Sequence, residues 1–149
     1  MATNVDTTPL APAVVGHPSA AMKQSKELPL IALGVVFWLA AALFIRLFGP
    51  AVFSENNPKL ILVFVLAFPV SYGFILISKK LGNLQKPEIL RAVTIMTTTA
   101  TFLDGVALAW FRQLYAQSFE VALYGAAWIL WGVGAGLLLG YCLTGRNNS

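Results

Sequence analysis

The sequence predicts an all-α fold, a four-helix transmembrane bundle with both termini cytoplasmic. Of its 149 residues, 58% are hydrophobic and only 11% are charged, whereas a soluble domain carries about 25% charged residues. The chain also contains four long apolar stretches, and about 20 helical residues cross the bilayer core of about 30 Å. We therefore expect the lipid bilayer to surround most of the chain, which crosses it at residues 28–48, 60–77, 92–111 and 121–143.

The ends of the chain differ in composition from these stretches. Residues 1–27 contain three prolines without helical periodicity, which predicts a flexible N-terminal tail. Within that tail Met22 precedes two lysines and is an alternative start. Residues 28–143 form one transmembrane domain in this interpretation, and residues 144–149 form a short polar C-terminal tail.

Prolines and glycines indicate where the predicted helices begin, bend and end. Gly49-Pro50 is expected to end the first helix, because proline disfavours helical geometry in the residue before it. Pro69 lies inside the second stretch and predicts a kink, since its ring nitrogen cannot bond to the carbonyl of Val65. Pro87 and Glu88 suit the first turn of the third helix.

Basic residues predict the orientation of the bundle. Seven lie in the N-terminal tail, in the loop between the second and third stretches or at the C-terminus, against three at the opposite end. Cytoplasmic loops carry the excess of lysine and arginine. The two groups are Lys23, Lys26, Lys79, Lys80, Lys86, Arg91 and Arg146, against Arg46, Lys59 and Arg112.

Asp104 is the candidate functional residue, because it lies near the middle of the third stretch. An ionised carboxylate at that depth costs at least ~2.5–3.5 kcal/mol, so the group must be protonated, paired or facing a cavity. Thr97 and Thr101 precede it at helical spacing and share its face. Two interpretations stay open: an intramembrane proton or cation site, and a hydrogen-bonding group that fixes helix packing.

Depth in the membrane suggests partners for Asp104. Trp128 lies about as far below the outer end of the fourth stretch as Asp104 does in the third, so its indole N–H could donate to the carboxylate. Arg46 lies nearer the outer surface and would have to bend inward to pair with Asp104. Tyr72 lies about two turns deeper, which is marginal for contact.

The fourth stretch carries a glycine face. Gly132, Gly136 and Gly140 recur every four residues, so their side of the helix permits close approach of another backbone. The spacing predicts tight packing, either within the bundle or against another copy or subunit.

Other functional classes lack their parts. One histidine (His17) and one cysteine (Cys142) cannot build an ordinary zinc or haem site, and no glycine-rich phosphate loop occurs. We therefore expect no metal, no cofactor and no enzymatic activity. Nucleic-acid binding is not expected either, because the ten basic residues form no clustered basic face.

Two short motifs carry a resemblance to a known family. They are Trp38-Leu39-Ala40 with Leu43 to Gly49, and Phe102-Leu103-Asp104-Gly105-Val106-Ala107-Leu108. The chain resembles a family of small bacterial four-helix membrane proteins of unknown function over Leu30 to about Leu143. The resemblance implies location in the bacterial cytoplasmic (inner) membrane, and it makes Arg46 and Asp104 residues to test. The chain is also similar in size to small multidrug-resistance exporters, but their essential acidic residue lies in the first helix, which has none here.

The leading functional hypothesis is a non-enzymatic accessory or structural subunit that packs through the glycine face of the fourth helix. The alternative is a small oligomeric transporter or channel that uses Asp104 as an intramembrane proton or cation site. In either case the protein can be a homo-oligomer or part of a larger membrane complex.

Overall fold

The computed structural model describes residues 26–145 and confirms an all-helical bundle. Its long helices are α1 (Glu27–Val52), α2 (Lys59–Leu81), α3 (Ile89–Trp110) and α4 (Phe119–Gly145). Two short 3₁₀ turns precede α3 and follow it, η2 (Lys86–Glu88) and η3 (Arg112–Leu114). The predicted tails lie almost wholly outside the described residues.

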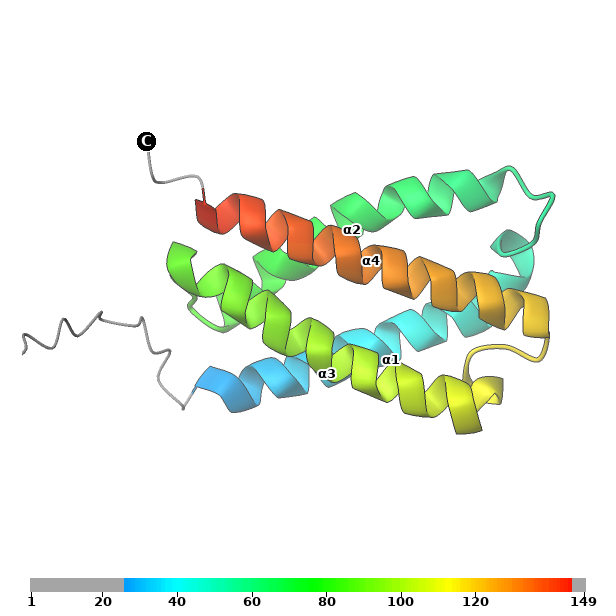
Figure 1. Ribbon diagram of the computed structural model, residues 1–149, viewed down its shortest axis with the longest axis horizontal. Helices are drawn as coiled ribbons and strands as arrows, with labels where there is room; N and C mark the ends of the chain where they lie inside the picture. The colour runs from blue at the N-terminus through cyan, green and yellow to red at the C-terminus, as the bar shows by residue number, and fades with distance from the viewer. Residues whose placement is uncertain (1–25, 146–149) are drawn as a thin grey trace, which may run out of the picture.

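The four helices lie side by side and alternate in direction (Figure 1). The α1–α2 and α3–α4 connections lie at one end of the bundle, which we call the loop end. The α2–α3 connection lies at the opposite end, together with the start of α1 and the end of α4. This up-and-down order is the simplest way for short loops to join neighbouring helices.

Each long helix is long and apolar enough to cross a membrane, as the sequence predicted. Large apolar side chains are exposed on all of them, among them Leu28, Leu62, Phe102 and Leu130, each more than half exposed. Such a surface is stable in hydrocarbon but not in water. The chain therefore has the form of a multi-pass membrane protein.

The predicted end of the first helix is wrong. α1 continues through Gly49-Pro50 to Val52, and the N–H of Phe53 then donates to the carbonyl of Gly49 at 2.7 Å. Pro50 lies in the last turn, where its missing N–H costs one hydrogen bond to the carbonyl of Arg46. Only two residues of the helix follow Pro50, so little of the hydrogen-bond ladder depends on the bond that the proline removes.

α2 runs as one helix through Pro69. Two tryptophans of α4 form hydrogen bonds with the backbone of α2 before this proline. The indole N–H of Trp128 donates to the carbonyl of Val63, and that of Trp131 donates to the carbonyl of Phe64, both at 3.0 Å. Proline disturbs the backbone of the turn before it. The two indoles therefore join α4 to α2 one and two residues before Val65, whose carbonyl loses its helical partner to Pro69.

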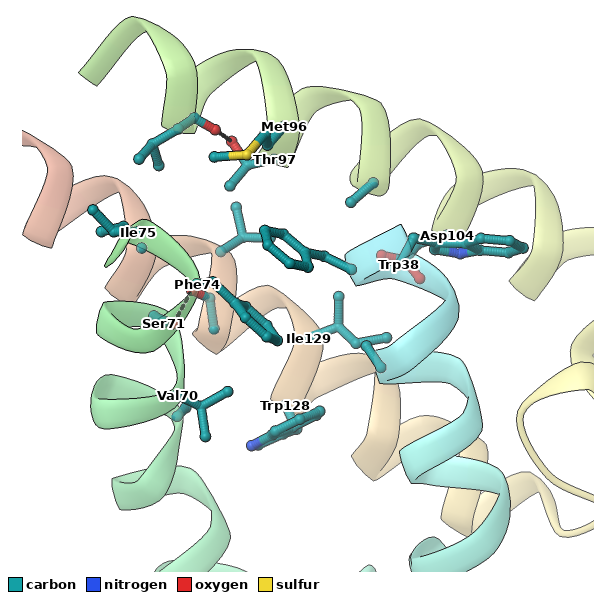
Figure 2. A pocket seen from close by; sticks show the side chains of 18 residues that line it. Trp38, Val70, Ser71, Phe74, Ile75, Met96, Thr97, Asp104, Trp128 and Ile129 are labelled. Carbon is teal, nitrogen blue, oxygen red and sulfur yellow. Dashed lines mark hydrogen bonds between the residues drawn. The ribbon is translucent and has the colours of Figure 1, made fainter. Parts of the chain in front are cut away.

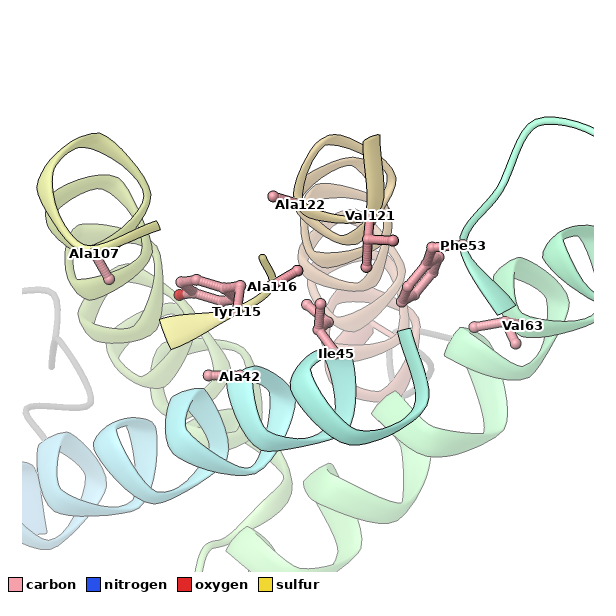
Figure 3. Close-up of a cluster of buried hydrophobic side chains, with 9 residues drawn as sticks. All are labelled: Ala42, Ile45, Phe53, Val63, Ala107, Tyr115, Ala116, Val121 and Ala122. Carbon is pink, nitrogen blue, oxygen red and sulfur yellow. The ribbon is translucent and has the colours of Figure 1, made fainter. Parts of the chain in front are cut away.

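Two apolar clusters fill the interior, one toward each end of the bundle. The cluster at the loop end is shown in Figure 3 and is built around Ile45, Phe53 and Tyr115, none of which is exposed. Toward the other end, α1 and α3 approach closely at Gly34, where an added Cβ would lie 2.8 Å from the carbonyl oxygen of Met96.

Candidate functional site

Asp104 lies on the inner side of α3 and is only 6% exposed. Its Oδ1 accepts a hydrogen bond from the hydroxyl of Tyr115, in the α3–α4 loop. That hydroxyl in turn accepts a hydrogen bond of 2.9 Å from the indole N–H of Trp38, on α1. One chain of hydrogen bonds therefore joins α1, the loop and α3 at the only buried carboxylate of residues 26–145.

Tyr115 reaches Asp104 because the chain folds back after α3. The helix ends at Trp110, and the η3 turn follows, closed by the N–H of Tyr115 donating to the carbonyl of Arg112 at 2.9 Å. The ring of Tyr115 then lies between the small side chains of Ala107 and Ala42 (Figure 3). Small residues on both helices leave room for this aromatic ring.

Burial raises the pKa of Tyr115 well above its usual value, and the hydrogen bond to Asp104 raises it further. A phenol with a raised pKa keeps its proton throughout the physiological range. Tyr115 is therefore a permanent donor to Asp104.

Arg46 holds the residues next to Tyr115. Its Nη1 donates to the carbonyl of Gln113 at 2.6 Å and lies 3.5 Å from the carbonyl of Leu114. The guanidinium group lies at an exposed position on α1, as expected of a long cation that reaches toward the membrane surface. The same loop is thus held by a cation through its backbone and by a carboxylate through Tyr115.

The partners predicted for Asp104 are wrong. Trp128 donates to the carbonyl of Val63, and Arg46 donates to the loop, so neither binds the carboxylate. The depth argument considered only side chains on facing helices, whereas the true partner comes from a loop that re-enters the bundle. A tyrosine inside a short polar loop was the signal that could have identified it.

Only one of the two predicted threonines lies beside the same interior space as Asp104. Thr97 is partly buried and donates to the carbonyls of Val93 and Thr94, at 2.8 and 3.2 Å. Thr101 is exposed and borders a second hollow, between α3 and α4, which Thr97 also lines. Only Thr97 therefore shares an interior space with Asp104.

That interior space is a cavity of about 120 Å³ between the four helices (Figure 2). Trp38 and Asp104 lie at one end of it, and side chains of α2 and α4 form the far wall. Most of the lining is apolar or aromatic. The polar groups on its wall are few: Ser71, Thr97, Asp104 and the indoles of Trp38 and Trp128.

Most of the predicted glycine face of α4 lines this cavity and does not contact another helix. Gly132 and Gly136 line the space, and a Cβ added to either would meet nothing within 4 Å. Only Gly140 makes the close contact expected, with an added Cβ 3.3 Å from the side chain of Val93 on α3. The tightest glycine contacts lie instead at Gly34, at Gly49 and at Gly125, where an added Cβ would lie 2.8 Å from its nearest neighbour.

Among residues 26–145, no group of three or more histidine, cysteine or acidic side chains is placed to hold a metal ion.

One family model matches the chain, described as "Family of unknown function (DUF5367)", over residues 52–147. The match includes Asp104 and Tyr115 but begins after the helix-one motif, so it is shorter at its start than the resemblance expected from Leu30. No curated protein and no solved structure matches the chain significantly.

Proposed function

Because this chain belongs to the family of unknown function DUF5367, we propose a function from its own geometry: a non-enzymatic accessory protein of the bacterial cytoplasmic membrane. The observation that carries the proposal is the hydrogen-bond chain from Trp38 through Tyr115 to Asp104. It gives the buried carboxylate a structural task, which is to fasten the α3–α4 loop inside the bundle. A rigid loop end then offers a fixed surface to a partner.

A partner would not bind through the glycine face. Gly136 and Gly140 are buried within the described bundle, so another subunit cannot reach them. The opposite side of α4 exposes Leu130, Gly134 and Leu138. This side suits either lipid or a neighbouring helix, because it is apolar and includes a residue without a side chain.

The orientation proposed is the one that the basic residues favour. Lys79, Lys80 and Lys86 lie at the end of the bundle away from the loop end. At the same end Lys26 pairs with Glu88 at 3.1 Å and Arg91 pairs with Glu27 at 2.6 Å. The topology rule counts lysine and arginine with little weight for acidic residues, so these pairs leave the prediction of a cytoplasmic end unchanged.

Purification from native membranes in mild detergent, followed by mass spectrometry, tests the accessory role. The proposal expects a partner at fixed stoichiometry that is lost when Tyr115→Phe loosens the loop end. Tyr141→Phe is the matched control, since Tyr141 is exposed on α4. Recovery of the protein without any partner, at every detergent concentration that keeps it folded, would contradict an accessory role.

A second candidate function has its own supporting observation. Asp104 uses Oδ1 for Tyr115 and also lines the central cavity, which is the arrangement of an intramembrane proton or cation site. Such a protein would be a small transporter or channel, and it would need further copies to enclose a pathway. Reconstituted liposomes test this role: it requires a pH-dependent flux that Asp104→Asn abolishes, and an unchanged flux in that variant would exclude it.

A further inference from the structure

The central cavity is lined by the carboxyl group of Asp104, one of whose oxygens accepts no hydrogen bond from residues 26–145. Oδ1 of Asp104 accepts from Tyr115, and the hydrogen bonds among residues 26–145 include none to Oδ2, while the indole of Trp38 lies beside the same carboxyl group. Oδ2 is not sealed in protein either, because that part of the chain contains no fully buried side-chain oxygen without a partner. Oδ2 therefore has some accessible surface, and Asp104 is one of the residues that line the central cavity.

The side-chain donors on the cavity wall are already used. Ser71 donates to the carbonyl of Gly132 at 3.2 Å, and Thr97 donates within its own helix. The indoles of Trp38 and Trp128 donate to Tyr115 and Val63. What remains available to an occupant is a set of acceptors: one carboxylate oxygen and the lone pairs of two hydroxyl groups.

The rest of the wall is apolar and aromatic. Phe37 and Phe74 stack with ring centroids 4.2 Å apart, and the rings of Trp38 and Trp128 border the same space. Aromatic faces attract cations, most strongly where water is excluded. The volume of about 120 Å³ is close to that of a dry cavity that accepts benzene, about 150 Å³.

We propose that this cavity is a binding site for a small organic ammonium ion whose hydrocarbon part is no larger than benzene. The ammonium group donates to Oδ2 of Asp104 and supplies the opposite charge, while the hydrocarbon part fills the aromatic wall. Water would fit this space less well than the organic ammonium ion, because the walls beyond the acceptors are apolar. The inference concerns binding alone and depends on neither a partner nor a flux.

Three probes of nearly equal size separate the contributions of charge, donor and shape. They are cyclopentylammonium, cyclopentanol and methylcyclopentane, each with as many heavy atoms as benzene. Calorimetric titration into nanodiscs that contain the protein, with empty nanodiscs subtracted, measures binding. Cyclopentylammonium is expected to bind saturably. Methylcyclopentane is expected to bind at least about tenfold more weakly, because a hydrogen bond to a charged group is lost. Cyclopentanol, which donates without charge, is expected to lie between them.

Two variants on the same helix locate the site. Gly136→Leu fills the cavity, since nothing lies within 4 Å of a Cβ there, whereas Gly134→Leu adds the same side chain on the exposed side of α4. Gly136→Leu should abolish binding of cyclopentylammonium, and Gly134→Leu should leave it unchanged. Asp104→Asn should weaken it about tenfold or more.

Three results would overturn the proposal: no saturable binding of cyclopentylammonium above empty nanodiscs, equal affinity for methylcyclopentane, or unchanged binding by Gly136→Leu. If Asp104→Asn fails to fold, the proposal is still tested by comparing Gly136→Leu with Gly134→Leu and by comparing cyclopentylammonium with methylcyclopentane. A pull-down that finds no partner bears only on the accessory role, so the two proposals fail separately.

Discussion

Arg46 and Asp104 do not bind each other, yet both hold the same three-residue piece of the α3–α4 loop. Arg46 donates to the backbone carbonyl of Gln113, and Asp104 accepts from the side chain of Tyr115. The first contact lies at an exposed position and the second is buried. The loop is therefore fixed both at the surface and in the interior of the loop end, which makes it a rigid part of the bundle.

Removing the hydroxyl of Tyr115 should destabilise the bundle. Tyr115→Phe leaves Asp104 without a donor and Trp38 without an acceptor, and an unsatisfied buried polar group costs about 1–3 kcal/mol. Thermal unfolding in detergent, followed by tryptophan fluorescence, should show this loss. Tyr141→Phe deletes the same atom at an exposed position and should be neutral. Equal stability of the two variants would remove the structural role from Tyr115.

Two glycines of different surroundings should respond in opposite directions to alanine. Gly34→Ala places a Cβ 2.8 Å from the backbone oxygen of Met96, so α1 and α3 must separate and the protein loses stability. Gly105→Ala, at an exposed position of α3 with nothing within 4 Å of the new Cβ, should gain about 0.5–1 kcal/mol of helix stability. Unfolding of both variants in one detergent checks the pair, and a stabilised Gly34→Ala would contradict the close contact.

Sequence reasoning identified the helices because their signal is local. Each apolar stretch is long enough to span a bilayer, and hydropathy alone reveals it. The ends of the helices were less predictable, as Pro50 shows: its effect depends on whether the helix still needs the hydrogen bond that proline removes. That need is small in a last turn, and the sequence pattern does not measure it.

The candidate site was predictable only in part. Asp104 was recognised because a carboxylate at membrane depth has few permitted environments. Tyr115 was missed because its position depends on how the loop turns after Trp110, which no periodicity encodes. The central cavity was missed for a related reason. A glycine repeat predicts close approach, but here Gly132 and Gly136 face a space that no side chain fills.

The protonation of Tyr115 should persist to alkaline pH. A free tyrosine has a pKa of about 10, and burial raises that of Tyr115 above it. The tyrosinate absorbance of the wild type minus that of Tyr115→Phe should therefore stay near zero to about pH 11, one unit above the free value. Because the folded-state pKa is the higher one, the contribution of this group to stability is complete below about pH 10 and is lost as pH rises through the folded pKa. A difference that appears near pH 10 would show an accessible phenol.

Labelling of single cysteines should reveal the orientation. In a Cys142→Ser background, Lys80→Cys lies at the proposed cytoplasmic end of α2 and Asn56→Cys lies in the exposed α1–α2 loop. A membrane-impermeant maleimide added to intact cells should label only Asn56→Cys, and permeabilised cells should be labelled at both positions. Labelling of Lys80→Cys alone in intact cells would reverse the topology.

The contact between Tyr115 and Asp104 is tested most directly by a double-mutant cycle of Tyr115→Phe and Asp104→Leu, measured as free energies of unfolding in detergent. Residues that share a buried hydrogen bond show coupling energies of about 0.5–3 kcal/mol. The structure predicts coupling in that range, with the double variant losing less stability than the sum of the single variants. Additive losses would mean that the loop is not held by Asp104, and the description of this site would be wrong.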